Sequence, residues 1–389
     1  MNRLDLAVLL FDLAPSGVVR NALRIAKASS EAGLNVEIWA ARADGEMRAL
    51  VPSDIALRTL GLEIGANYSR AQRKRASLSA ASALEGLLSA HRPRILLSAG
   101  NHVHPLAVKA FQRSNAVGTR LIGRVSNALP RFSRSPLLIG PSLYKRLQAR
   151  RRYRAMHRLI AVSEGLRTDL VNDLGIEPEK IDVIANGVDL DEVERKAGEP
   201  IDHPWFSAGG PPVVVGVGRL VAQKDFATLI RAFANARKSM PMRLMILGSG
   251  PQQSMLAALA VRLGISGDVD LPGHIANPFP YLKRASLFVL PSRWEGMSNA
   301  LLEALASGCP AVATRCSGSV EILQEGEWGT LVPVAREDAL ASAIVETLRK
   351  PPARESQLRR AADYSLAVTM SRYVQIFRDE ILLGARSGD

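Results

Sequence analysis

Residues 290–314, LPSRWEGMSNALLEALASGCPAVAT, carry the pattern of a strand end, a helix and a second strand. The first strand is predicted at residues 285–291, which are mostly apolar. Residues 299–307 have leucines at helical spacing, and residues 311–314 are again apolar. Gly308 follows the helix and supplies the left-handed residue that commonly ends one. A strand–helix–strand unit of this kind predicts a parallel sheet with helices packed on it.

Two carboxylates flank the start of this helix. Glu295 lies in the loop and Glu303 follows it by eight residues. Glu303 points away from Leu301, Leu302 and Leu305, which share one side at helical spacing and predict the buried face. A sugar or a ribose offers neighbouring hydroxyls, and a carboxylate can accept hydrogen bonds from them. The alternative is an ordinary helix with two surface glutamates, and the spacing alone does not decide between them.

Composition places the chain among globular proteins. Its 389 residues are 47% apolar and 22% charged, which is enough for two domains of ordinary size. No run of about 18 apolar residues is present, so the sequence predicts no membrane-spanning helix. Asp5 and Asp12 interrupt the apolar start of the chain, which predicts a first strand instead of a signal peptide. Cys309 and Cys316 lack a metal-ligand pattern and suit a reducing compartment, which predicts a cytoplasmic protein.

The net charge of +13 is concentrated in the first half of the chain. Residues 64–163 contain 19 lysines and arginines against one acid, Glu85. Such a surface suits nucleic acid, an anionic lipid or an anionic substrate. Nucleic acid is the weakest of the three, because aromatic residues are sparse and no helix-turn-helix, RNA-recognition or zinc-finger signature is present. The sequence therefore predicts no nucleic-acid partner.

Two predicted helices carry much of this charge. Residues 69–90 form the first, which begins with a basic run: Arg70, Arg73, Lys74 and Arg75. Residues 141–161 form the second, whose apolar members, Leu143, Leu147, Tyr153 and Met156, leave a mostly basic surface. We expect this surface to contact anionic lipid headgroups, at roughly 1 kcal/mol for each base near the membrane. The alternative is that this face is only solvated. The predicted partner is an anionic membrane, and the protein is predicted to be peripheral on the cytoplasmic side of it.

The first part of the chain predicts a βαβ unit. Residues 4–11 and 35–40 are predicted strands, and residues 18–32 form the helix between them, which implies a right-handed crossover and a parallel sheet. Gly17 lies at the turn from the first strand to the helix. A small residue there lets a ligand approach the helix N-terminus, which favours anions. The alternative is a turn that binds nothing.

Candidate metal ligands are few. His102 and His104 follow a predicted buried strand, residues 94–98, at the carboxyl edge where ligands bind in open α/β folds. The alternatives are that the two histidines are solvated, that they are structural, or that they form half of a metal site whose other half is not evident. The pairs at residues 189–191 and 268–270 have the spacing of a metal-binding D-x-D motif, but three-residue matches arise easily by chance. The sequence predicts no metal site.

Arg219 and Lys224 lie in the loop between a predicted strand, residues 213–217, and a predicted helix, residues 226–238. Asp225 is the predicted N-cap of that helix. Arginine offers a planar fork and lysine a point charge, and a helix N-terminus favours anions. The loop therefore predicts a diphosphate site.

Three segments together resemble a known family: EGMSNALLEALASGCPAV (295–312), GRLVAQKD (218–225) and NGVD (186–189). They are similar to the signature of retaining glycosyltransferases of the GT-B fold, and of glycosyltransferase family 4 in particular. The resemblance implies an α/β fold in which two Rossmann-like domains face each other across a cleft, the acceptor side first and the nucleotide side second. The predicted boundaries are 1–195 for the acceptor-binding domain, 205–365 for the nucleotide-sugar-binding domain, and 366–389 for a helix that crosses back to the first domain.

The resemblance also implies roles for single residues. Arg219 and Lys224 would grip the donor diphosphate and stabilise the leaving nucleotide, so that no metal or other cofactor is required. Glu303 would bond the ribose hydroxyls and Glu295 the hexose hydroxyls. The predicted catalytic residues are Arg219, Lys224, Glu295 and His104, whose imidazole would face the donor sugar, with His102 as the alternative.

The remaining predicted contacts are to the donor and the acceptor. Those to the donor are Gly17 at the first turn, Gly273, His274 and Ile275 around the base, and the backbone of Gly296, Met297 and Ser298 at the sugar or phosphate. Those to the acceptor are Arg124, Ser126 and Asn127, which lie at the end of a predicted strand, residues 120–125.

The reaction implied by the resemblance is transfer of a hexose or N-acetylhexosamine from a UDP-sugar to a hydroxyl of a lipid-linked or cell-envelope glycan. The anomeric configuration would be retained by same-face attack, because no second carboxylate nucleophile is evident. The alternatives are GDP-mannose or another donor, a soluble acceptor as in a phosphorylase or trehalose-type enzyme, and a non-catalytic module that binds sugar nucleotides or polyanions.

Overall fold

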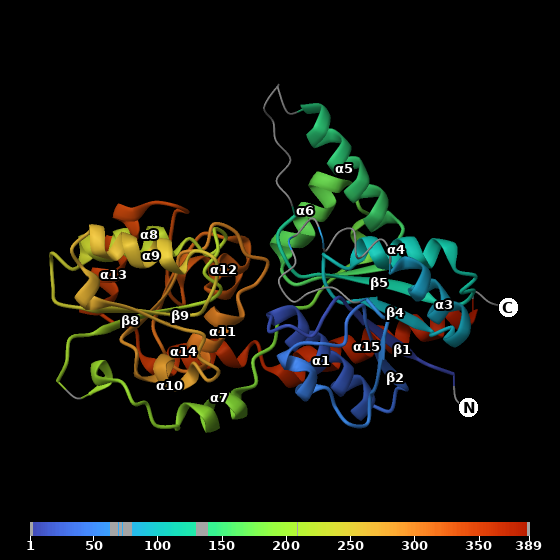
Figure 1. Ribbon diagram of the computed structural model, residues 1–389, viewed down its shortest axis with the longest axis horizontal. Helices are drawn as coiled ribbons and strands as arrows, with labels where there is room; N and C mark the ends of the chain where they lie inside the picture. The colour runs from blue at the N-terminus through green and yellow to red at the C-terminus, as the bar shows by residue number, and fades with distance from the viewer. Residues whose placement is uncertain are drawn as a thin grey trace. The chain divides into compact units, whose positions relative to one another are not determined.

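The computed structural model describes residues 3–62, 69, 72, 80–129, 139–207 and 209–386. The chain forms two compact units (Figure 1): residues 1–185 together with 368–389, and residues 186–367. The predicted basic run at Arg70, Arg73, Lys74 and Arg75 lies outside the described residues.

The first unit contains a parallel sheet in the order β3-β2-β1-β4-β5-β6-β7. The strands are β1 (Leu6–Leu10), β2 (Val36–Ala40), β3 (Ala56–Thr59), β4 (Ile95–Ser98), β5 (Arg120–Val125), β6 (Arg158–Ala161) and β7 (Ile181–Val183). β1 is fully buried along its length, as expected when helices cover both faces of a sheet. The strand order reverses direction between β1 and β4, and in open α/β sheets this is where ligands bind, beyond the carboxyl ends of the strands.

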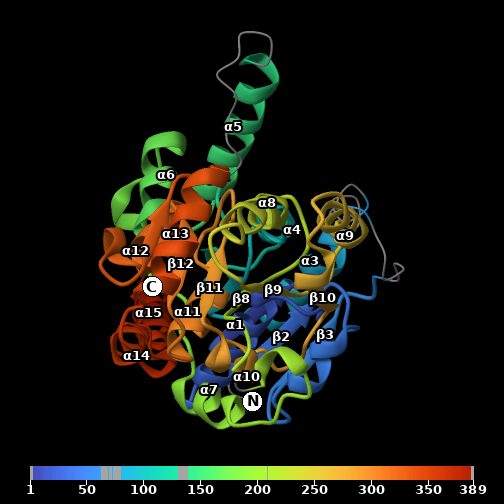
Figure 2. The same cartoon turned by 90° about the vertical axis from the view of Figure 1, so that its left-hand side faces the viewer.

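Helices cover both faces of this sheet (Figure 1). The helices of the first unit are α1 (Gly17–Glu31), α3 (Ala81–His91), α4 (His104–Arg113), α5 (Ile139–Arg154), α6 (Glu164–Leu174) and α15 (Leu366–Arg386), and most of α5 projects from the sheet (Figure 1 and Figure 2). The last helix belongs to the first unit from Val368 onward. Its Tyr373 hydroxyl accepts a hydrogen bond from Nε of Arg124 at 3.0 Å. Its Glu380 is nearly fully buried and pairs with both Arg120 and Arg158.

The second unit repeats the topology, with the strand order β10-β9-β8-β11-β12-β13, again all parallel. Its strands are β8 (Val213–Val217), β9 (Arg243–Leu247), β10 (Val269–Gly273), β11 (Leu287–Leu290), β12 (Ala311–Thr314) and β13 (Thr330–Val332). Its helices are α7 (Leu190–Ala197), α8 (Phe226–Ala236), α9 (Gln253–Arg262), α10 (Phe279–Arg284), α11 (Asn299–Ala306), α12 (Ser317–Ile322), α13 (Glu337–Arg349) and α14 (Arg354–Ala362). Here β8 and β11 are the neighbours at which the order reverses. Both units are therefore Rossmann-like.

Close packing between β8 and α8 depends on one glycine. A Cβ on Gly216 would lie 2.9 Å from the ring of Phe226, the first residue of α8. Phe226 is itself almost fully buried among the apolar side chains of β8, β9 and α8. Gly216 thus lets the start of α8 approach the sheet directly above the loop that joins them.

The strand–helix–strand pattern of residues 290–314 is confirmed, with α11 between β11 and β12. Gly308 has a φ of +71°, as predicted for the residue that ends this helix. The prediction of one helix over residues 141–161 is wrong in its last part, because α5 ends at Arg154 and β6 follows. Residues 159–161 are buried and pair with β5 and β7.

The first unit ends ten residues before the predicted boundary at residue 195. Asn186 donates from Nδ2 to Oδ1 of Asn299 at 2.8 Å, and the N–H of Val188 donates to the carbonyl of Tyr364 at 2.8 Å. These bonds attach residues 186–188 to the second unit. No helix in the described part of the chain is long and apolar enough to cross a membrane.

Candidate functional site

Two loops meet at the carboxyl ends of β8 and β11, the point where the second sheet reverses its order. One loop is residues 218–225, after β8, and the other is residues 291–298, after β11. The N–H of Arg293 donates to the carbonyl of Gln223 at 2.8 Å, and Nε2 of Gln223 donates to the carbonyl of Trp294 at 3.0 Å. The two loops are thus joined to each other, at the position where doubly wound folds bind their ligands.

An ion pair joins the same two loops. Nζ of Lys224 lies 2.7 Å from Oε1 of Glu295, and the side chains are 17% and 8% exposed. The hydroxyl of Ser292 donates to the same Oε1 at 2.7 Å. Both bonds engage one oxygen, so the carboxylate is held in one orientation and its Oε2 is the oxygen left for another donor. A carboxylate oriented in this way suits binding of a sugar hydroxyl.

The end of β12 fixes the backbone of the second loop. The carbonyl of Ser292 accepts from Oγ1 of Thr314 at 2.5 Å and from Sγ of Cys316 at 3.1 Å. The carbonyl of Glu295 accepts from Oγ of Ser317 at 3.1 Å. A Cβ on Gly318 would lie 2.3 Å from the carbonyl oxygen of Gly296, so only glycine permits α12 to approach this closely.

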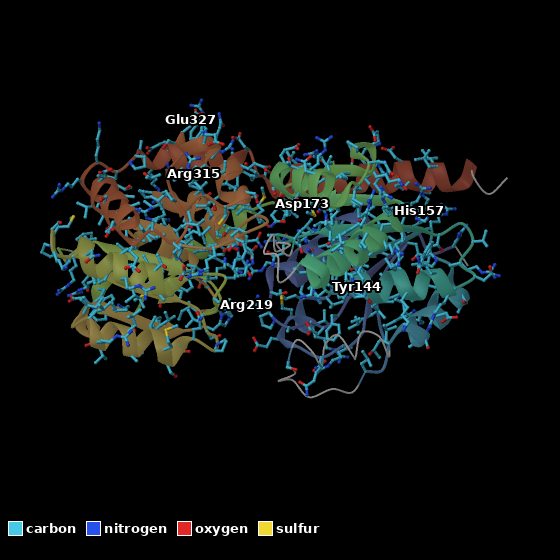
Figure 3. All side chains as sticks on the ribbon, turned by 90° about the horizontal axis from the view of Figure 1, so that it is seen from above. Tyr144, His157, Asp173, Arg219, Arg315 and Glu327 are labelled. Carbon is cyan, nitrogen blue, oxygen red and sulfur yellow. The ribbon has the colours of Figure 1, made fainter. Side chains whose placement is uncertain are left out.

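Glycines also bring a third loop to the site. Gly248, after β9, has a φ of +149°, and a Cβ there would lie 1.9 Å from the carbonyl oxygen of Gly218. The N–H of Leu220 donates to the carbonyl of Ser249 at 2.9 Å. The turn of residues 248–250 therefore supports the backbone on both sides of Arg219, whose side chain is exposed (Figure 3).

Asp225 occupies the N-cap position of α8 but does not cap it in the predicted way. Its φ is +47°, and its side chain accepts no backbone hydrogen bond of the helix. Oδ2 instead accepts from Oγ1 of Thr228 and from Nε of Arg293, both at 2.9 Å. Asp225 therefore connects the two loops a second time, beside the Lys224–Glu295 pair.

The start of α11 presents its backbone. Oγ of Ser298 accepts from the N–H of Leu301 at 3.3 Å and so caps the helix. Within the described residues, the N–H groups of Gly296, Met297 and Ser298 donate no hydrogen bond. Successive N–H groups at a helix start form a concave anion site. Glu303 is half-buried one turn into α11, while Leu301, Leu302 and Leu305 are fully buried, as the leucine spacing predicted.

The predicted base contacts follow β10, on the far side of β9. Gly273 has a φ of +88°, and its carbonyl accepts from the N–H of Gly248 at 2.7 Å. His274 is exposed and Ile275 is half-buried. These residues lie at the same carboxyl edge as Lys224 and Glu295, but β10 is two strands away from β8 and three away from β11.

His104 is not at the surface of the first unit. It is fully buried, with Nδ1 2.7 Å from Oγ of Ser98 and its ring edge-on to Tyr153 at 5.7 Å. Burial lowers the pKa of His104 to about 3, so the imidazole is neutral. Its Nε2 is buried, without a hydrogen-bond partner among the described residues. His104 is thus enclosed by the first unit, whereas His102, the alternative, is exposed; the sugar-facing role stays a prediction.

Gly17 and His102 lie at the point where the first sheet reverses its order. Gly17 is exposed at the first position of α1, behind Ser16, whose Oγ accepts from the N–H of Val19 at 3.2 Å. A Cβ on Gly100 would lie 2.7 Å from Cγ1 of Val18. The loop after β4 therefore touches the start of α1.

The three predicted acceptor contacts divide into two groups. Arg124 is 2% exposed within β5 and bonds to Tyr373, so it lies inside the first unit; its acceptor contact stays a prediction. Ser126 and Asn127 are half-buried just beyond β5. The N–H of Ser126 donates to Oδ1 of Asn101 at 2.9 Å, and Nδ2 of Asn101 donates to the carbonyl of Asn127 at 3.1 Å. The sequence interpretation missed Asn101, although it directly precedes His102.

Three of the four aspartates in the D-x-D pairs make other contacts. Oδ1 of Asp189 accepts from the N–H of Glu192 at 3.0 Å and caps α7. Asp268 pairs with Arg237, and Oδ2 of Asp270 lies 3.0 Å from Nε2 of His203. In the described part of the chain, no cluster of three or more histidine, cysteine, aspartate or glutamate side chains could hold a metal ion.

Two Rossmann-like units of this topology define the GT-B class of glycosyltransferase folds. Among solved structures, Anabaena HepE in complex with UDP superimposes with a TM-score of 0.75 at 17% identity, over 96% of this chain and all of that one. Residues 15–192 match the model for Glycosyltransferase Family 4, and residues 211–350 match the model for Glycosyl transferases group 1. Both matching models are glycosyltransferase models, and each matches less than half of the chain.

Two curated relatives are similar to part of the chain. One is the Campylobacter jejuni N-acetylgalactosamine-N,N'-diacetylbacillosaminyl-diphospho-undecaprenol 4-alpha-N-acetylgalactosaminyltransferase, 33% identical over 57% of this chain and 59% of its own length. The other is the lipopolysaccharide core biosynthesis glycosyltransferase LpsE of Rhizobium meliloti, 35% identical over 45% of this chain and 49% of its own length. The match spans about half the length of these relatives.

Proposed function

We propose that this protein transfers a hexose or N-acetylhexosamine from a UDP-sugar to a hydroxyl of a lipid-linked or cell-envelope glycan. The observation that carries the proposal is the Lys224–Glu295 pair at the reversal point of the second sheet. In the proposal, Lys224 is the cation for the diphosphate and Glu295 the carboxylate for the sugar, and the two lie within one ion-pair distance. The relatives support the acceptor class, since one acts on a diphospho-undecaprenol-linked sugar and another in lipopolysaccharide core synthesis.

In this proposal, the donor diphosphate lies against Arg219, Lys224 and the N–H groups of residues 296–298. Arg219 is exposed, and those N–H groups make no hydrogen bond within the described residues, so both can take up phosphate oxygens. Positive charge and N–H dipoles stabilise the diphosphate as it leaves. These groups can do so without a metal ion, and we propose metal-independent transfer.

Glu295 binds the sugar and does not attack it. Its Oε1 is bonded by both Lys224 and Ser292, which lowers the tendency of the carboxylate to act as a nucleophile. Oε2 then accepts from a hydroxyl of the sugar, and Glu303 accepts from the ribose. We propose that the acceptor hydroxyl attacks from the face that the diphosphate leaves and gives its proton to the departing phosphate. Attack from this face retains the anomeric configuration of the transferred sugar.

Arrival of the diphosphate changes the partner of Lys224. The ammonium of Lys224 pairs with Glu295 in the structure; with donor bound, it is shared with a diphosphate of higher charge. Ser292 then continues to hold Oε1. In the first unit, His102 takes the sugar-facing role that the sequence interpretation gave to His104, because His102 is exposed and His104 is enclosed.

We place the protein in the cytoplasm, peripheral to the membrane that carries its acceptor. The basic first unit supports this placement, with 19 bases between residues 64 and 163. Activity is tested by measuring release of UDP, GDP or ADP from a panel of UDP-, GDP- and ADP-sugars with lipid-linked glycan acceptors. We expect release from a UDP-sugar by the wild type and its loss in Glu295→Gln. Equal release by Glu295→Gln, or release from a GDP-sugar alone, would contradict the proposal.

A further inference from the structure

Asn186 is the first residue of the second unit, and its side chain is 6% exposed. Its Nδ2 donates to Oδ1 of Asn299, the first residue of α11, at 2.8 Å and to the carbonyl of Met297 at 3.4 Å. Its backbone N–H donates to Sδ of Met297 at 3.1 Å. Three hydrogen bonds from one residue therefore hold the segment that joins Glu295 to α11.

The backbone that carries Asn186 is itself anchored. Two residues later, the N–H of Val188 donates to the carbonyl of Tyr364 at 2.8 Å. The carbonyl of Val188 accepts from the N–H of Leu366 at 2.9 Å, so that Val188 forms a parallel bridge with Ser365. Asn186 thus reaches the start of α11 from a fixed position within the second unit.

The bond to the carbonyl of Met297 acts on the other end of the same peptide bond. A trans peptide bond is planar, so the carbonyl of Met297 and the N–H of Ser298 lie in one plane and point in opposite directions. A donor that holds this carbonyl therefore sets the direction of the N–H of Ser298. That N–H is one of the three groups that the proposed function gives to the donor diphosphate.

A second side chain acts in the same way one peptide bond earlier in the loop. Oγ of Ser317 donates to the carbonyl of Glu295 at 3.1 Å. This carbonyl shares its peptide plane with the N–H of Gly296, which is also assigned to the diphosphate in the proposed function. Asn186 and Ser317 come from different parts of the chain, and between them they orient two of the three N–H groups.

We infer that Asn186 is a positioning residue for the donor diphosphate: by holding the carbonyl of Met297, it aims the N–H of Ser298 at a phosphate oxygen. This role rests on the proposed function, in which that N–H binds the diphosphate. The amide of Asn186 has two hydrogens, and Met297 and Asn299 take one each. Asn186 therefore acts through the loop. An N–H oriented before the anion arrives stabilises it without further reorganisation.

The test compares Asn186→Leu with Thr347→Val in the full chain. Leucine is similar to asparagine in size but donates no hydrogen bond. Thr347 is 7% exposed, and its Oγ1 lies 3.4 Å from Oγ1 of Thr330, the first residue of β13 and so at the amino edge of the sheet. Both variants should unfold at a lower urea concentration than the wild type, since each loses a buried hydrogen bond. Only Asn186→Leu should raise the dissociation constant of UDP, by about tenfold.

Uridine separates positioning of the phosphate site from general damage. It lacks the diphosphate, and its predicted contacts follow β10, so its affinity should be the same for Asn186→Leu and the wild type. Asn299→Ala removes one partner of Nδ2 but leaves the bond to Met297, and it should weaken UDP binding less than Asn186→Leu does. An equal effect of Asn299→Ala would overturn the route through Met297.

Amide hydrogen exchange locates the effect in the loop. UDP should slow exchange in residues 295–299 of the wild type and slow it less in Asn186→Leu. Three results would overturn the positioning role: wild-type UDP affinity in Asn186→Leu, an equal loss of UDP and uridine affinity in that variant, or an equal loss of UDP affinity in Thr347→Val. Wild-type binding of UDP is measured first, because its absence would overturn the proposed function as well, whereas the other results leave the proposed function intact.

Discussion

Nζ of Lys224 lies 2.7 Å from Oε1 of Glu295. The two residues come from loops after β8 and β11, which are neighbouring strands although the chain visits β9 and β10 between them. The reversal of strand order thus brings together a cation from a strand-to-helix turn and a carboxylate from the segment before α11. Each of the two charged groups is paired with the other, and the first predictions follow from that pairing.

Glu295→Gln keeps the shape of the side chain and removes its charge. The variant should lower transfer about 100-fold, since a hydrogen bond to a charged group contributes roughly 1.5–3 kcal/mol. UDP binding should be retained, because the ammonium of Lys224 is freed for the diphosphate. Transfer and UDP titration are measured on the same preparation, with Glu327→Gln as an exposed control. Loss of UDP binding together with transfer would argue that Glu295 maintains the loop and does not bind the sugar.

Ser292→Ala removes one of the two bonds to Oε1 of Glu295. Ser292 is fully buried, and its hydroxyl donates to Glu295 at 2.7 Å. We expect a loss of about 1 kcal/mol in the free energy of unfolding, measured in urea. Affinity for the UDP-sugar should fall while affinity for UDP stays the same, because only the sugar uses the oriented carboxylate. An equal fall for both ligands would contradict the orienting role.

Gly318→Ala should disturb the site without touching any charged group. The added Cβ would lie 2.3 Å from the carbonyl oxygen of Gly296 and 2.7 Å from Cα of Met297. Overpacking of this kind costs about 1–3 kcal/mol, and the loop 295–298 must move. The affinity for UDP and the free energy of unfolding should both decrease. Gly267→Ala is the matched control, because a Cβ there meets nothing within 4 Å; identical behaviour of the two variants would show that the contact is easily relieved.

Burial of His104 makes stability depend on pH. Its folded pKa is about 3 and its ordinary value is 6.5, so between these values the unfolded chain binds the extra proton. The contribution of His104 to the free energy of unfolding is therefore complete above about pH 6.5. It falls by about 1.4 kcal/mol per pH unit below that pH. His104→Phe should flatten the fall in unfolding free energy between pH 6.5 and 5. An unchanged slope would mean that His104 is not enclosed.

Sequence patterns predicted the second unit better than the first. The segments around Lys224 and Glu295 have local signals, since apolar strands, a loop and a helix follow one another within a few residues. β6 was missed because its arginine and apolar residues continue the pattern of the basic helix before it. β3 and β13 are short and partly exposed, so they lack the continuous apolar run of a buried strand.

The positions of His104 and Arg124 depend on contacts that no local pattern contains. In the sequence, His102 and His104 are equivalent members of an H-x-H pair. His104 is the first residue of α4, and its ring lies beside Ser98 and Tyr153. Arg124 is buried by Tyr373, which lies 249 residues later in the chain. Such placements follow from how the helices pack on the sheet, and a single sequence does not reveal them.

The central claim is that Lys224, with Arg219, forms a site for a nucleoside diphosphate that functions without metal. The most direct measurement is the thermal shift of wild type and Lys224→Ala with UDP, GDP, ADP and UMP, each without and with EDTA. A ligand that binds only the folded chain raises the melting temperature. We predict a shift with UDP that exceeds those with GDP, ADP and UMP, is unchanged by EDTA and is lost in Lys224→Ala. No shift with any diphosphate, or a UDP shift that EDTA abolishes, would contradict the claim.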